Sequence, residues 1–396
     1  MKFPAKTSLF MCLFLFVSCK NMYSPIEDIS HITQKKSMRP FSSLNDPIVI
    51  TMPVYQKMGL MGGTADVRSK RQGDIFVVYD WESGNVYDWA FFEGNHGLSN
   101  WRAVEMGTPT KYYDAGEGSS LIGCLDPATG RVTVTQNAVQ GTFENLNNNQ
   151  STKSRYGIIG TSGRENGCST YNVNFFDSET GKVSGEKKSI FIYGSSNIMT
   201  PSVDAKGNYW MGYIEPNAEY NYLAKFCGET QSIETYRTIP VCKTSTYEVM
   251  CQLLAYDHYL LVNDGVRPLY PNVLIYDTDD MTKPPVEIEI PTGDTGYAYL
   301  GRAAYINGTL YAVLWDHSNS YARNMIYKVD VEEKKFEFLT EFNFDFTETI
   351  YVRGSRIYFL SSRKLSRLSM RYYDTVTGEV SGVNAFTIDE VCANAH

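Results

Sequence analysis

A short turn sequence recurs along this chain at nearly constant intervals. In its clearest copy, Phe175–Val183, an apolar run is interrupted by Asp-Ser-Glu-Thr-Gly and then resumes. Six further copies lie at Tyr79–Gly84, Leu125–Gly130, Phe226–Thr230, Tyr276–Thr278, Val329–Glu333 and Tyr373–Gly378. Measured between their Asp residues, with Cys227 standing for Asp in one copy, the successive intervals are 46, 51, 50, 50, 53 and 44 residues. A period near 50 residues indicates a repeat architecture.

The segments between these turns have the composition of β-strands. Aromatic residues make up 14% of the chain and long Ala/Leu/Glu/Lys stretches are missing, so little helix is expected. Near Cys227, for example, strand-like runs cover Gly207–Tyr213, Tyr222–Phe226 and Ser232–Tyr236. With one further strand, each repeat becomes a four-stranded antiparallel sheet, and such sheets arranged radially are the blades of a β-propeller.

The number of turns favours seven blades. The first two copies are the least regular, so six blades with an N-terminal extension is the alternative. Two unrelated β-sandwiches would account for the short strands but not for the regular interval. We therefore predict an all-β chain in which residues 47–396 form a single propeller domain.

The N-terminus has the features of a bacterial lipoprotein signal. Two Lys residues precede the apolar run Leu9–Val17, which is too short to cross a bilayer that needs about 20 residues. Phe16-Val17-Ser18-Cys19 resembles a lipobox, in which the Cys is lipidated, for example with palmitate, and becomes the mature N-terminus. We expect residues 1–18 to be a signal peptide and Cys19 to anchor the chain to a membrane. An ordinary signal peptide with a chance Cys is the alternative.

The segment after Cys19 has no sustained periodicity. Residues 20–46 are polar and contain Pro25 and Pro40. We predict that residues 19–46 form a lipidated, flexible tether that spans on the order of 30 Å.

Charge and Cys content narrow the classes of partner. Removal of residues 1–18 takes away two Lys and leaves 34 basic residues against 44 acidic ones, a formal charge of about −10. Nucleic acid is therefore not an expected partner, because phosphate binding needs a basic surface. Six Cys follow Cys19, and an exported chain permits disulfides, with Cys242 and Cys251 the closest pair in sequence. No Cys or His cluster has the spacing of a zinc site, so no metal or cofactor is expected.

Taken together, the signal, the lipobox, the tether and the Asp-x-x-Thr-Gly repeats resemble the β-propeller lipoproteins of bacterial envelopes, particularly the TolB-like propellers of Bacteroidetes. The resemblance implies a lipid-anchored protein of the bacterial cell envelope, on the outer membrane, with the periplasmic or the surface face left open. Many relatives carry a Gly-rich segment after the first turn, where this chain has Glu93–Asn100. The resemblance implies no single activity.

The repeated Asp residues are assigned to the scaffold. Asp at the start of a turn caps backbone N–H groups, and Gly supplies a positive φ. The turns also differ from the sialidase-type Ser-x-Asp-x-Gly-x-Thr-Trp sequence.

The loops between the second and third strands of the blades should meet on the face opposite the Asp turns. Mixed charges and aromatic rings in these loops would suit a polar ligand or a protein surface. The candidate binding residues on this face are Tyr112, Tyr113, Glu215, Tyr220, Asp264, Arg267, Tyr270, Asp316, His317, Arg323 and Arg363.

No standard catalytic constellation stands out. The chain has no Gly-x-Ser-x-Gly elbow, His-Glu-x-x-His motif or Walker loop. Asp316 and His317 are adjacent, and neighbouring residues of a strand point to opposite faces. Pairs of acids for glycoside cleavage could be assembled from Glu117, Glu215, Asp264 and Asp316. Whether the protein is an enzyme is left open, and a non-catalytic role is favoured.

The leading hypothesis is a membrane-anchored envelope lipoprotein whose propeller is a non-catalytic binding or scaffold module for a protein or a polysaccharide. The alternative is a glycan-active hydrolase or lyase with its site in the propeller mouth. A third option is a structural subunit of an outer-membrane assembly complex. A clear scaffold without a recognisable catalytic set favours the first.

Overall fold

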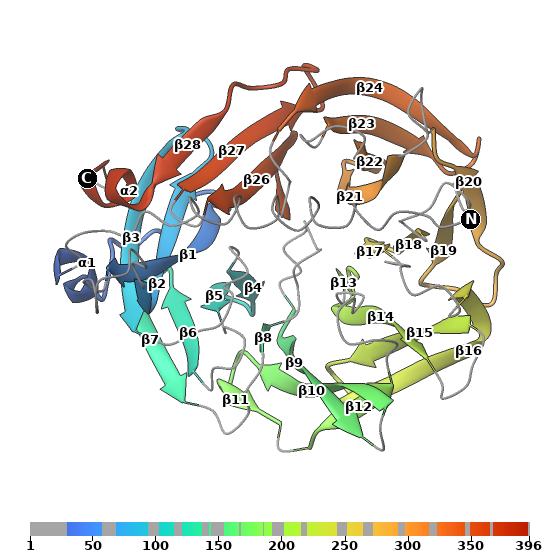
Figure 1. Ribbon diagram of the computed structural model, residues 1–396, viewed down its shortest axis with the longest axis horizontal. Helices are drawn as coiled ribbons and strands as arrows, with labels where there is room; N and C mark the ends of the chain where they lie inside the picture. The colour runs from blue at the N-terminus through green and yellow to red at the C-terminus, as the bar shows by residue number, and fades with distance from the viewer. Residues whose placement is uncertain are drawn as a thin grey trace, which may run out of the picture.

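Seven antiparallel sheets are arranged in a ring, and the chain visits them in order (Figure 1). The structure is a computed structural model that describes residues 30–57, 69–93, 103–114, 121–136, 142–143, 154–165, 168–184, 186–191, 202–214, 220–243, 252–263, 272–291, 298–316, 323–344, 349–364 and 367–394. The predicted seven-bladed β-propeller is confirmed.

The blades are numbered 1 to 7 in chain order. Blade 1 contains β1 (Ile48–Lys57), β2 (Ser69–Asp80) and β3 (Asn85–Glu93). Blade 2 contains β4 (Val104–Met106), β5 (Lys111–Asp114), β6 (Leu121–Asp126) and β7 (Arg131–Gln136). Blade 3 contains β8 (Thr142–Phe143), β9 (Tyr156–Glu165), β10 (Cys168–Asp177), β11 (Lys182–Val183) and β12 (Lys188–Phe191). Blade 4 contains β13 (Ser202–Val203), β14 (Asn208–Ile214), β15 (Tyr220–Cys227) and β16 (Ser232–Lys243).

The remaining blades repeat the four-stranded plan. Blade 5 contains β17 (Gln252–Tyr256), β18 (Tyr259–Asn263), β19 (Asn272–Asp277) and β20 (Val286–Glu289). Blade 6 contains β21 (Ala298–Ile306), β22 (Thr309–Asp316), β23 (Arg323–Asp330) and β24 (Lys335–Asn343). Blade 7 contains β25 (Thr349–Arg353), β26 (Arg356–Lys364), β27 (Arg367–Asp374) and β28 (Asn384–Thr387).

Two blades depart from this plan. In blade 3 the outermost position is shared by β11 and β12, which both pair with β10. In the described part of blade 1 there are three strands, and the Asp80 turn joins β2 to β3. In the other blades the corresponding turn joins the third strand to the fourth, so β1 occupies the position of a second strand.

The Asp turns are built as the sequence predicts. In six of the seven turns the Asp carboxylate accepts a hydrogen bond of 2.9–3.1 Å from a backbone N–H two or three residues later. Four of the turns then place a Gly at a φ of 66° to 76°. In two of the three turns without the Gly, Gln231 and Lys334 adopt φ values of 49° and 53°. These residues are therefore scaffold, and the face of the ring that carries them is called the turn face below.

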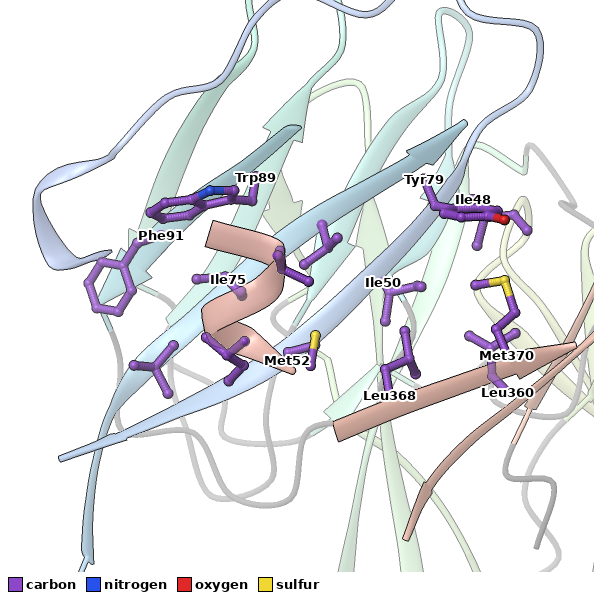
Figure 2. Close-up of a cluster of buried hydrophobic side chains, with 14 of the residues drawn as sticks. Ile48, Ile50, Met52, Ile75, Tyr79, Trp89, Phe91, Leu360, Leu368 and Met370 are labelled. Atoms are coloured by element: carbon purple, nitrogen blue, oxygen red, sulfur yellow. The ribbon is translucent and has the colours of Figure 1, made fainter. Parts of the chain in front are cut away.

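Side chains packed between neighbouring blades form the core. Figure 2 shows the cluster between blades 7 and 1, where Leu360, Leu368 and Met370 lie against Ile50 and Met52. Large aromatic rings fill comparable positions elsewhere, and Trp210 and Trp315 are almost fully buried. This packing accounts for the high aromatic content of the chain, because the wedge between two radial sheets needs bulky side chains.

The ring closes without exchange of strands among the described residues, since each sheet comes from one continuous stretch of chain. The free edge of β1 is instead capped by its neighbours. Val49 O accepts hydrogen bonds from Tyr351 Oη at 2.8 Å and from Ala103 N at 3.3 Å. Pro47 O accepts one from Arg353 Nη2 at 3.0 Å.

The segment before blade 1 is part of the folded body. The sequence predicts a flexible tether through residue 46, whereas α1 (Ser30–Gln34) and residues 35–46 lie against blades 1 and 2. Ile32, Met38 and Phe41 are buried in the clusters of these blades. These three apolar residues are too widely spaced to form a periodic pattern, so their packing cannot be predicted from the sequence. Residues 30–46 are called the strap below.

Neither α1 nor α2 (Ile388–Asn394) approaches the length needed to cross a membrane, and the described residues contain no other helix.

Candidate functional site

Most of the predicted binding residues fall where the structure gives no side chain. Cys19, Glu215, Asp264, Arg267, Tyr270 and His317 lie outside the described residues. Tyr220, Asp316 and Arg363 are placed as backbone near the ends of β15, β22 and β26. For these nine residues the expected roles stay predictions.

Arg323 begins β23 at the end of blade 6 opposite the Asp330 turn. Its Cα is in register with that of Asp316 on β22, so these two predicted residues do come together. Its guanidinium forms an ion pair with Glu341 on β24. This end of blade 6 therefore carries the mixed charges that the sequence predicts there.

Tyr112 and Tyr113 are placed differently from the exposed mouth position expected for them. Both are 3% exposed. Tyr112 packs against Phe41 of the strap, with ring centroids 5.7 Å apart. Tyr113 packs against Phe176 of blade 3 at 5.1 Å and donates a hydrogen bond to Ser178 O at 3.1 Å. Burial raises the pKa of both phenols, which hold blade 2 to its neighbours.

A polar cleft opens on the turn face between blades 3 and 4. Its volume is about 530 Å³, within the range of roughly 300–1,000 Å³ that is typical of small-molecule sites. It is lined by Ser154, Arg155, Tyr156, Ala205, Lys206, Gly207, Asn208, Cys227, Gly228 and Glu229.

Three short segments form the cleft. Residues 154–156 lead into β9 on the blade 3 side. On the blade 4 side, residues 205–208 connect β13 to β14, and residues 227–229 belong to the turn after β15. The turn between β13 and β14 is fixed by the buried Asp204 carboxylate, which accepts hydrogen bonds from Lys206 N at 2.9 Å, Asn208 N at 2.9 Å and Trp210 Nε1 at 2.8 Å.

Two glycines let the blades approach closely beneath the cleft. A Cβ on Gly207 would lie 2.6 Å from Ser154 Oγ, and a Cβ on Gly228 would lie 2.4 Å from Tyr156 Cβ. Gly207 also has a φ of 79°, which an L side chain rarely adopts. Tyr209 Oη donates a hydrogen bond to Tyr156 O at 3.2 Å across the same junction. The cleft is therefore preformed by backbone packing.

The cations of the cleft are already paired. Arg155 donates through Nε and Nη2 to the two carboxylate oxygens of Asp177, at 3.0 and 2.8 Å, and its Nη1 lies 2.9 Å from Glu179 Oε2. The hydrogen bonds from Arg155 lower the pKa of Asp177 to about 2. Lys206 Nζ lies 2.6 Å from Asp279 Oδ1, and this contact raises the pKa of Lys206.

The cleft coincides with the one degenerate copy of the repeated turn. Cys227 stands where the other turns have Asp, so Glu229 N has no carboxylate cap, and Gln231 replaces the usual Gly. Sequence reasoning missed the site, although the departure at Cys227 is visible in the repeat. What the sequence does not show is that residues 154–156 pack against this turn, because the two segments are about 70 positions apart.

The chemistry of the lining favours binding of a polar group. It offers hydroxyl, amide and thiol groups, which can donate and accept hydrogen bonds, and a carboxylate, which accepts them. Within the described ranges, no group of three or more His, Cys, Asp or Glu side chains could hold a metal ion.

Comparison with known proteins identifies the fold. No family model and no curated protein matches the chain. A solved protein from Lactobacillus plantarum superposes with a TM-score of 0.51 at 10% identity, over 87% of this chain and 97% of its own. TolB from Acinetobacter baumannii gives 0.38 at 11% identity, over 85% and 82% of the two chains. An oligogalacturonate lyase in complex with manganese gives 0.44 at 11% identity, over 85% of each. At such identities the likeness shows the propeller fold alone, which binding proteins and enzymes share.

Proposed function

We propose that this protein is a lipid-anchored envelope protein whose propeller is a non-catalytic recognition module, with the cleft between blades 3 and 4 as a binding site. The observation that carries the proposal is a preformed polar cleft whose cations already have partners. A rigid cleft of this kind binds without the free-energy cost of ordering its own side chains. The Arg155 guanidinium, held by Asp177 and Glu179, orients the rim in the absence of a ligand.

The anchor is proposed at Cys19. Ten residues, 20–29, separate this Cys from α1, and ten residues reach at most about 33–36 Å when fully extended. Because the strap packs on blades 1 and 2, the edge of the ring at these blades would lie nearest the membrane. Metabolic labelling with palmitate should mark the wild-type chain and not a Cys19→Ala variant. A labelled variant, or an unlabelled wild type, would contradict the anchor.

Binding is tested with the full chain, extracted in detergent, on arrays of envelope glycans and by co-purification from envelopes. Retention of an intact glycan or of one defined protein is expected, and it should be lost in Ala205→Trp. Ala205 is exposed in the cleft and only its backbone N–H is used by the fold, in a bond to Asp257 O at 3.1 Å. Release of shortened glycans would instead favour the alternative, a glycan-active enzyme. If the Ala205→Trp variant retains the ligand as well as the wild type does, the binding site is not this cleft.

A further inference from the structure

We infer that the cleft between blades 3 and 4 binds a neutral saccharide unit, of one or two sugar rings. The inference rests on the proposed function, since it assumes that this cleft is a recognition site. It is argued from the charges, the hydrogen-bonding groups and the size of the cleft.

Charged ligands of either sign meet opposition in the cleft. An anion would approach the carboxylate of Glu229 and those of Asp177 and Glu179, which already neutralise Arg155. A cation would approach Lys206, which lines the cleft together with Arg155. An anion would have to displace an existing ion pair to gain a partner, and a cation that approached Glu229 would meet the positive charges of Lys206 and Arg155. A neutral ligand leaves these pairs in place and can accept or donate hydrogen bonds at their edges.

The cleft contains both donors and acceptors of hydrogen bonds that the fold does not use. Glu229 takes part in no hydrogen bond or ion pair among the described residues, so both its carboxylate and its backbone N–H are available. The Asn208 amide uses its NH₂ group on Asp204, at 3.1 and 3.3 Å, which leaves the amide oxygen as an acceptor. Sugar hydroxyls each donate one hydrogen bond and accept others, and they match such a mixed set.

Size and polarity also fit a sugar. A volume of about 530 Å³ holds a ligand larger than an ion, and the mostly polar lining gives an acyl chain little to contact. Tyr156 adds one aromatic side chain beside Gly228, while the Arg155 guanidinium lies 5.0 Å from its ring centroid. The apolar C–H face of a sugar ring can pack beside such an aromatic side chain.

Cys227 provides a direct report on occupancy. Cys227 lines the cleft, the residue is partly exposed, and its thiol is free. The full chain in detergent is treated with iodoacetamide in the presence of neutral hexose and N-acetylhexosamine disaccharides, galacturonic acid or lysine methyl ester. Peptide mass spectrometry then gives the alkylation rate at each Cys. We expect a neutral disaccharide to slow alkylation of Cys227 at least several-fold. The free thiols of Cys124 and Cys392, distant in sequence and not part of the cleft lining, should be unaffected and serve as internal controls.

Variants connect the protection to the cleft. Glu229→Gln should weaken protection of Cys227 several-fold, because the carboxylate accepts stronger hydrogen bonds than an amide. Glu332→Gln is the matched control, since it changes the acid at the same position of the blade 6 turn and should have no effect. Thermal unfolding of both variants checks that each remains folded.

The outcomes separate the ligand class from the proposed function. Protection by galacturonic acid or lysine methyl ester, but by no neutral sugar, would overturn the saccharide inference and keep the recognition site. Protection only by a purified envelope protein would do the same. If neither the sugars, the charged probes nor envelope fractions slow the alkylation of Cys227, both the inference and the proposed cleft are wrong.

Discussion

Arg353, at the end of β25, places a buried positive charge where the first and last blades of the ring meet. Its side chain is 1% exposed and that of its partner Glu105, on β4, is 2% exposed, with 2.7 Å between Nη2 and Oε1. Burial opposes the charge on Arg353, but Glu105 and Asp46 outweigh it, and the pKa of Arg353 lies above its usual value. A single residue of blade 7 thus contacts blade 2 and, through Pro47 O, the residue that immediately precedes β1.

Replacement of Arg353 by Met should strongly destabilise the fold. It leaves the Glu105 carboxylate buried without a counter-charge, and breaking a buried pair in this way costs about 3–5 kcal/mol. Urea unfolding measures the loss, and Lys283→Met, which removes an exposed ion pair, should change the free energy of unfolding very little. The double variant Arg353→Met/Glu105→Leu should be more stable than Arg353→Met alone. A double variant that is no better would show that packing, and not charge, is lost.

Asp177 should be the carboxylate with a clearly depressed pKa at the rim of the cleft. Its pKa is about 2 in the folded protein because of the hydrogen bonds from Arg155, against about 3.9 in an unfolded chain. The stabilisation from this pair is therefore fully present above about pH 4 and is lost as the pH falls through 2. Carboxyl NMR titration should show the pKa of Asp177 rising towards 3.9 in Arg155→Gln. In Glu179→Gln the pair with Arg155 persists, and a comparable rise there would contradict this assignment.

At the scale of single elements, the repeated turns depend on backbone conformation as well as on the Asp cap. Gly378 has a φ of 73° with open space around the position of a Cβ, whereas Gly382 has equal space and an ordinary φ. Lys334 adopts a φ of 53° with a full side chain. Substitutions at these three positions can therefore distinguish the effect of a strained φ from the effect of steric contact by a new side chain.

Substitutions at these positions should change stability in opposite directions. Gly378→Ala should lower the free energy of unfolding by about 1–2 kcal/mol, the cost of a left-handed conformation for an L-residue. Lys334→Gly should raise it by up to about 1 kcal/mol, since a strained residue is relieved although the unfolded chain gains freedom. Gly382→Ala should be neutral or slightly stabilising. Chemical denaturation decides, and equal effects of Gly378→Ala and Gly382→Ala would exclude φ as the cause.

The same turns show what the sequence can and cannot predict. Residues that cap the turns, such as Asp177 and Asp374, recur at regular intervals in the sequence, so blade number and strand order could be predicted from them. Contacts between blades produce no such regular pattern in the sequence. Tyr112 and Tyr113 were expected in an exposed loop, but they belong to the short strand β5 and point into the packing on both of its sides. The cleft beside Cys227 was missed for a related reason, because its other wall comes from the neighbouring blade.

At the scale of the whole molecule, both ends of the described chain pack on β3. Ile32 of α1 and Ile388 and Val391 of α2 share the cluster that contains Trp89 and Phe91. Three cations of the strap lie over aromatic rings of β3, at 4.3–4.6 Å from the ring centroids: Arg39 over Tyr87, Lys35 over Trp89 and Lys36 over Phe91. Lys35 Nζ also lies 2.5 Å from Asp88 Oδ1. The strap thus covers the outer edge of the blade that has three strands.

The strap should therefore be needed for a stable ring. A chain that begins at Asp46 lacks Ile32, Met38 and Phe41, which are each buried, and burial of one such side chain contributes about 1.5–3 kcal/mol. It also exposes the rings of β3 and the edge of β7, where Ser37 pairs with Arg131. We expect its thermal unfolding midpoint to fall by many degrees, with faster hydrogen exchange in β3 and β7, relative to a chain that begins at Asp28 and keeps the whole strap. If the two chains unfold at the same temperature, the strap only rests on the propeller, and closure depends on blades 7, 1 and 2 alone.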